Sequence, residues 1–105
     1  MSSDTLRPMT AYVLSAIVPV ASPKEAEDIC SVLAEELGKM GWDEGTQYWE
    51  PTRDDGPVVQ GWLLLDAESL TEAANRLLSA FGLAWKKASG AELVLGMLRI
   101  EPDAS

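Results

Sequence analysis

Two segments of the chain, SPKEA at residues 22–26 and SLTEA at residues 69–73, repeat one pattern 47 residues apart. Each follows an apolar run of strand type, at residues 12–18 and 59–65 respectively. A serine with a glutamate three positions later is the capping box that begins an α-helix. Each copy therefore predicts a strand followed by a helix. Because a further strand candidate follows each helix, the expected element order is β-α-β-β-α-β.

The periodicity of the apolar residues gives the expected extent of each element. Strands are predicted at residues 10–18, 46–50, 58–66 and 91–101, where β-branched and aromatic residues concentrate. The first helix starts at Ser22 and stops near Gly41, and the second runs from Ser69 to about Ala84. Helical spacing places the following residues inward: Ala26, Ile29, Cys30, Leu33, Leu37 and Met40 in the first helix, and Leu70, Ala73, Ala74, Leu77, Leu78 and Phe81 in the second.

This order predicts a single α+β domain over residues 10–101, with flexible tails at 1–9 and 102–105. Two right-handed β-α-β halves joined by a hairpin form a four-stranded antiparallel sheet with both helices on one face. The arrangement resembles the ferredoxin-like sandwich, which implies a fold but no particular function.

The strands carry apolar residues on both faces of the predicted sheet. One set is the expected core face: Tyr12, Leu14, Ala16, Val18, Val59, Gly61, Leu63 and Leu65. The opposite set is also mostly apolar, although two helices can cover only one face. We expect a second copy of the chain or another protein to cover it, and the alternative is that loops or termini fold over it. The residues assigned to this interface are Val13, Ile17, Gln60, Trp62, Leu64, Leu95, Met97 and Arg99.

The chain is strongly acidic, with 17 acidic and 8 basic residues and a formal charge of −9. Such a surface repels phosphate backbones and anionic lipids, so neither nucleic acid nor membrane is expected as a partner. A basic protein surface, including one that normally holds nucleic acid, is a better match. The alternative is that the acidity serves solubility alone. The acidic residues assigned to partner binding are Glu35, Glu36, Asp43, Glu44, Asp54 and Asp55, with Trp42, Tyr48 and Trp49 as aromatic anchors.

Residue types that support catalysis are scarce. The chain has no histidine, which is the commonest general acid–base and a frequent metal ligand. Its one cysteine, Cys30, falls on the apolar stripe of the first helix and is interpreted as a core residue in a reduced, cytoplasmic setting. Asp54 and Asp55 are too few to form a calcium loop. We therefore expect no enzyme activity, no metal and no cofactor.

The chain lacks the motifs of other protein families that share this topology. The RNA-recognition signature of glycines alternating with aromatics is absent, since residues 58–65 read VVQGWLLL. The Cys-x-x-Cys pair of ferredoxin-like copper carriers is missing from the first strand-to-helix loop, at residues 19–22. The Val-Gln-Gly segment at residues 59–61 is similar to one in acylphosphatases, but it lies in the wrong strand and has no arginine nearby.

The sequence therefore predicts a small, acidic, non-enzymatic protein-binding module. In size and charge it is similar to phage-encoded inhibitors that occupy a surface on another protein. Two alternatives remain open: a homo-oligomeric regulatory domain that senses a small ligand, and a structural subunit of a larger assembly.

Overall fold

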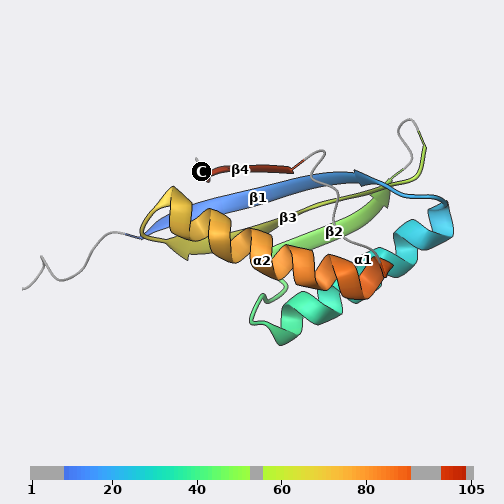
Figure 1. The fold of residues 1–105 in the computed structure, drawn as a ribbon, viewed down its shortest axis with the longest axis horizontal. Coiled ribbons are helices and arrows are strands. Elements are labelled where there is room, and N and C mark those ends of the chain that lie inside the picture. Colours follow the sequence, from blue (N-terminus) through green and yellow to red (C-terminus); the bar gives the residue numbers. More distant parts are fainter. Residues whose placement is uncertain (1–8, 53–55, 91–97, 104–105) are drawn as a thin grey trace, which may run out of the picture.

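The computed structural model describes residues 9–52, 56–90 and 98–103 of the chain, and its elements follow the predicted order (Figure 1). They are β1 (Thr10–Pro19), α1 (Pro23–Lys39), β2 (Gln47–Thr52), β3 (Val58–Ala67), α2 (Leu70–Ser89) and β4 (Leu98–Pro102).

The strands form one sheet in the order β2-β3-β1-β4, and every neighbouring pair is antiparallel. It follows that β1 and β2 run parallel to each other with β3 between them. Likewise, β3 and β4 run parallel with β1 between them. Each helix thus connects two parallel strands across a third, and both helices lie on the same side of the sheet (Figure 1). The predicted α+β class and the four-stranded antiparallel sheet are confirmed.

Both helices begin with the predicted capping box. The Glu25 backbone N–H donates to Ser22 Oγ at 3.1 Å, and the Ala21 N–H donates to Glu25 Oε2 at 3.1 Å. In the second half, Glu72 N–H donates to Ser69 Oγ at 3.1 Å, and Glu68 N–H donates to Glu72 Oε2 at 3.0 Å. These bonds satisfy amide groups that have no partner within the helix itself. The two sequence segments that lie 47 residues apart thus form the same pair of capping hydrogen bonds.

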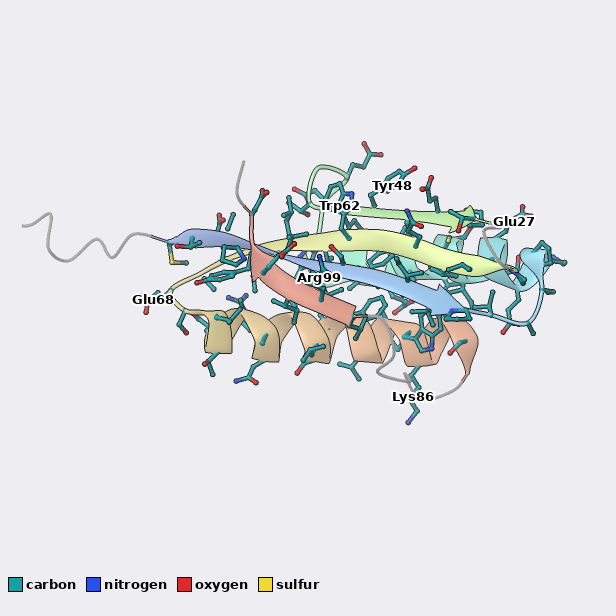
Figure 2. The ribbon with its side chains drawn as sticks, turned by 90° about the horizontal axis from the view of Figure 1, so that it is seen from above. Glu27, Tyr48, Trp62, Glu68, Lys86 and Arg99 are labelled. Atoms are coloured by element: carbon teal, nitrogen blue, oxygen red, sulfur yellow. The ribbon has the colours of Figure 1, made fainter. Side chains whose placement is uncertain are left out.

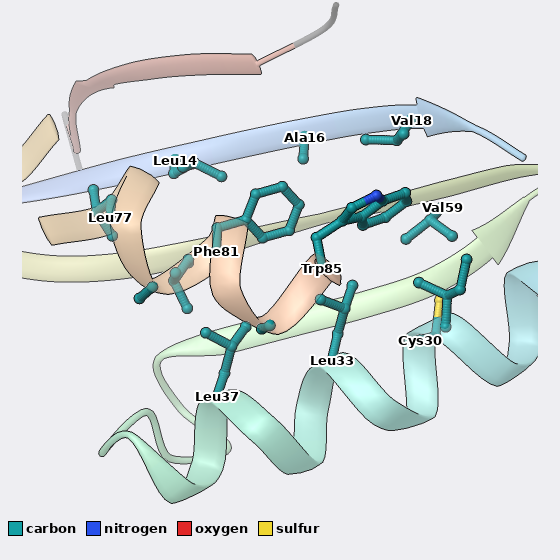
Figure 3. Close-up of a cluster of buried hydrophobic side chains, with 14 of the residues drawn as sticks. Leu14, Ala16, Val18, Cys30, Leu33, Leu37, Val59, Leu77, Phe81 and Trp85 are labelled. Carbon is teal, nitrogen blue, oxygen red and sulfur yellow. The ribbon is translucent and has the colours of Figure 1, made fainter. Parts of the chain in front are cut away.

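The core lies between the sheet and the two helices (Figure 3). It contains the predicted sheet residues Tyr12, Leu14, Ala16, Val18, Val59 and Leu63, together with Ile29, Leu33, Leu37, Leu77 and Phe81 of the helices. Aromatic rings from β2 and α2 meet within it. Trp49 of β2 stacks on Phe81 with centroids 5.2 Å apart, and Phe81 contacts Trp85 at 6.0 Å. This aromatic contact ties the edge strand β2 to α2.

The second helix is longer than predicted. It continues to Ser89 instead of ending near Ala84, because Trp85 is buried and Gly90 provides a left-handed cap at φ 76°. Ala73, Leu77 and Phe81 are buried as predicted, but two other residues assigned inward are exposed. Leu70 is 50% exposed, and Leu78 is exposed as well, so their inward assignment is wrong. Leu70 occupies the first helical position, and Leu78 lies beside the stripe formed by the buried residues Ala73, Leu77, Ala80, Phe81, Ala84 and Trp85.

Smaller differences concern the ends of elements. Met40 is exposed because it caps α1 instead of extending its apolar stripe. The strand β2 runs to Thr52, beyond the predicted end at Glu50, and β4 includes Pro102, which was assigned to the tail. The predicted start of the fourth strand, at residues 91–97, lies outside the described residues.

Gly61 of β3 allows β2 to approach closely. A Cβ added there would collide with the Tyr48 carbonyl and the Trp49 ring. We expect Gly61→Ala to lower the free energy of unfolding by about 1–3 kcal/mol, as overpacking of a core does. Urea titration followed by tryptophan fluorescence measures this value.

Gly38→Ala is the matched control. A Cβ at Gly38, within α1, meets nothing within 4 Å, so this variant should gain about 0.5–1 kcal/mol through helix propensity. Equal stability of the Gly61→Ala variant and the wild type would contradict the close packing of β2 against β3.

Candidate functional site

The structure brings several of the predicted partner-binding residues to one place. An open hollow of about 670 Å³ lies between the second half of α1, the turn that follows it, and β2. Glu35, Asp43 and Glu44 line it, together with Trp42, Tyr48 and Trp49. We call this feature the acidic hollow. Its three carboxylates all belong to residues that are exposed to solvent.

Hydrogen bonds from the backbone and from the Trp42 side chain fix the turn that carries Asp43 and Glu44. The Trp42 backbone N–H donates to the Leu37 carbonyl at 3.0 Å, and its indole Nε1 donates to the Leu64 carbonyl at 2.6 Å. Thr46 N–H donates to the Asp43 carbonyl at 3.0 Å. The turn is therefore attached to α1 at one end and to β3 at the other, which holds its carboxylates beside β2.

Gln47 organises the floor of the hollow. Its amide Nε2 donates to the Ala34 carbonyl at 3.1 Å and to the Trp42 carbonyl at 2.8 Å, and its Oε1 accepts from Trp49 Nε1 at 2.9 Å. One side chain thus connects α1, the turn and β2. Sequence reasoning missed Gln47. It lies two positions before Trp49 in β2, so the two side chains share the face that points towards the helices, and this spacing could have identified it.

The three aromatic residues differ in how they are held. Trp42 and Trp49 pack against the core and use their indole N–H groups in internal hydrogen bonds, so they form a fixed wall. Tyr48 is 48% exposed and stacks on Trp62 with ring centroids 6.2 Å apart. Its hydroxyl donates to Glu50 Oε2 at 2.7 Å. This hydrogen bond and the charge of Glu50 raise the pKa of Tyr48, which stays neutral and available as an aromatic surface.

Glu36 lies in a different environment from Glu35. Its side chain is only 12% exposed, and it pairs with Lys39 at 3.1 Å and with Lys87 of α2 at 3.2 Å. Hydrogen bonds from both lysines lower the pKa of Glu36. Glu36 therefore joins α1 to α2, whereas Glu35, which pairs with Lys39 at 3.6 Å, stays on the surface. Asp54 and Asp55 lie outside the described residues.

The face of the sheet away from the helices carries most of the second predicted set. The register places Val13 beside Leu64, Ile17 beside Gln60, and Trp62 beside Tyr48. These side chains are half-buried, except that Tyr48 and Ile17 are exposed, the latter to 43%. Arg99 of β4 joins the same face (Figure 2). We call this surface the open face. Leu95 and Met97, which were assigned to it, lie outside the described residues.

Cys30 is a buried residue of α1 and belongs to the core cluster, as predicted. Burial, together with the negative charge of Glu50, raises the pKa of its thiol from 9.0 to about 11. The thiol is therefore protonated at neutral pH and a poor nucleophile. Within residues 9–52, 56–90 and 98–103, no group of three or more histidine, cysteine, aspartate or glutamate residues could hold a metal ion. None of the described helices is long and apolar enough to cross a membrane.

Comparison with known proteins gives no further assignment: no protein-family model matches the chain, and no curated protein sequence matches it.

The raised pKa of Cys30 predicts a pH dependence of stability. The folded state disfavours the charged thiolate form of Cys30. The stability that the protonated thiol contributes is therefore fully present below pH 9 and is lost as the pH rises towards about 11. Two pKa units correspond to at most about 3 kcal/mol. Urea unfolding at pH 8 and pH 10.5 should show a different change in stability for Cys30→Ala than for the wild type, because only the wild type carries this titration. Parallel changes in the two proteins would contradict a desolvated thiol.

Proposed function

We propose that the protein is a non-enzymatic binding module that holds arginine or lysine side chains of a partner protein in the acidic hollow. The observation that carries this proposal is that Glu35, Asp43 and Glu44 line one hollow together with three aromatic residues. The residues that line the hollow come from the helix, the turn and the strand, so the hollow exists only in the folded chain.

The chemistry of the hollow suits a basic side chain. A guanidinium forms charge-assisted, often bidentate hydrogen bonds with carboxylates, and these are stronger than neutral ones. The formal charge of −9 would speed the encounter with a basic surface.

By occupying a basic surface of the partner protein, the module would act as an inhibitor of that protein. A partner surface rich in arginine and lysine, such as one that ordinarily binds nucleic acid, would lose access to its own ligand while the hollow holds it. We propose this competitive mode, which requires no chemistry from the module beyond the carboxylates and rings already described.

We also assign the fold to the ferredoxin-like sandwich. The assignment rests on the order β2-β3-β1-β4, on the two split β-α-β units, and on the position of both helices on one face. In this arrangement the turn between α1 and β2 lies beside the edge strand β2, where a partner can reach the hollow without passing over the sheet.

Charge reversal at the hollow tests the proposed function. The probe is an arginine-rich hexapeptide, titrated into ¹⁵N-labelled protein and followed by NMR. Asp43→Lys combined with Glu44→Lys should weaken binding by tenfold or more, because one charge-assisted hydrogen bond contributes about 1.5–3 kcal/mol. Chemical-shift changes in the wild type should concentrate at residues 34–49.

The matched control is Glu27→Lys combined with Asp28→Lys, at exposed positions near the start of α1. Each pair changes the formal charge from −9 to −5, since each substitution adds two units. The control should bind the hexapeptide nearly as well as the wild type. Equal weakening in both variants would show that peptide binding depends only on net charge, and it would contradict the assignment of the hollow as the binding site.

A further inference from the structure

The open face has a row of four side chains that crosses the whole sheet. The register aligns Tyr48 of β2 with Trp62 of β3, Trp62 with Ser15 of β1, and Ser15 with Arg99 of β4. Ser15 lies near the middle of β1, so the row crosses the centre of the face. Figure 2 labels three of the four residues in this row, Tyr48, Trp62 and Arg99.

The two halves of the row differ in a complementary way. The half on β2 and β3 carries the two large stacked rings of Tyr48 and Trp62. The Tyr48 hydroxyl donates a hydrogen bond to the Glu50 carboxylate. The half on β1 and β4 carries a small serine and an exposed arginine. Within the described part of the chain, the Arg99 side chain forms no ion pair or hydrogen bond.

We propose that a second copy of this chain covers the open face, related by a two-fold axis that runs parallel to the strands between β1 and β3. This rotation places β4 of one copy over β2 of the other, and β1 over β3. The Arg99 guanidinium then lies over the Tyr48 ring and near Glu50 of the other copy, while Ser15 lies opposite Trp62. The symmetry makes each of these contacts twice.

These contacts are favourable in charge and in size. Arginine over an aromatic ring gains a cation–π contact, and a nearby carboxylate adds a charge-assisted hydrogen bond. A serine opposite a tryptophan gives the large-against-small alternation by which facing sheets interdigitate at about 10 Å. In the row on one side, Gln60 of one copy meets Ile17 of the other, and in the row on the other side Val13 meets Leu64.

A two-fold axis perpendicular to the strands fits less well. Placed through the same row, it would set Arg99 against Arg99 and Trp62 against Trp62. Two guanidinium groups would then face each other in a desolvated interface, away from the carboxylate of Glu50. Like charges brought together in this way cost several kcal/mol, so the parallel axis is the one that the face supports.

The area of the face is sufficient for a small dimer. β1 and β3 each have ten residues, which gives a length of roughly 33 Å. Four strands side by side give a width of roughly 15–20 Å. The product is about 500–660 Å². The edge strands β2 and β4 have only six and five residues, so the face lies towards the lower value. This area approaches the ~600 Å² per partner at the lower end of stable interfaces.

The net negative charge does not oppose this dimer strongly. The carboxylates of the acidic hollow lie at the rim formed by α1, its following turn and β2. At physiological salt, repulsion between exposed charges more than ~8 Å apart is largely screened. A pair that the interface buries, such as Arg99 with Glu50, is screened much less than exposed charges. Added salt should therefore leave the dimer intact, whereas it should weaken the binding of a basic partner to the hollow. The two proposals can accordingly fail independently.

Sedimentation velocity tests the interface. The wild type is expected to sediment as a dimer, and Arg99→Glu as a monomer, because the new carboxylate would face the Tyr48 ring and Glu50 of the second copy. Arg76→Glu makes the same charge change at an exposed position on α2 and should remain a dimer. Circular dichroism on each variant checks that the fold is retained.

A mixing experiment tests the axis itself. Glu50→Arg alone should also give a monomer, since the introduced guanidinium would face Arg99 of the second copy. An equimolar mixture of the Arg99→Glu and Glu50→Arg variants should form a heterodimer. On one side of that heterodimer the two substituted side chains form an ion pair of reversed polarity, and on the other side the native Arg99–Glu50 pair is kept.

Three outcomes would each overturn the proposal: a monomeric wild type, a dimer that survives Arg99→Glu, or a mixture of the two variants that stays monomeric. A monomeric wild type would instead point to another protein, or a segment of the chain itself, as the cover of the open face.

Discussion

The arrangement of the whole molecule follows from one constraint: two helices can cover only one face of a four-stranded sheet. The helices bury Leu14, Val59 and Leu63 on that face, and a capping box positions each helix relative to the strand that precedes it. The opposite face keeps Val13, Trp62 and Leu64 only half-buried. A surface of this kind, which is mostly apolar and not covered by the helices, is a candidate interface in a small domain. The edge strand β2 connects this surface to the acidic hollow, because Tyr48 stacks on Trp62 and also lines the hollow.

Much of the fold could be predicted because its signals are local. Ser22 with Glu25, and Ser69 with Glu72, specify helix starts by hydrogen bonds within one turn. The alternation of side chains along β1 and β3 indicated which residues face the helices, and the buried set agrees. The end of α2 was missed because no local signal shows that Trp85 packs against Phe81, a contact that continues the helix to Ser89.

The candidate sites depend on distant contacts, and these could be predicted only in part. The sequence grouped Glu35 with Glu36, because nothing local shows that Lys87 reaches Glu36 from the other helix. It named Trp42 and Trp49 as anchors, but not Gln47, whose three hydrogen bonds link segments that are 2 to 13 residues away from it. The row that joins Tyr48 to Arg99 appeared only when the strand register was known.

The most direct test of the account is the solvent exposure of the Trp62 ring as a function of protein concentration. NMR with a soluble paramagnetic co-solute reports this exposure through the broadening of the ring signals. The Trp62 signals should be broadened in dilute protein and protected in concentrated protein, while those of buried Trp85 are protected throughout. Broadening of Trp62 that is equally strong at every concentration would contradict the claim that a second copy covers the open face.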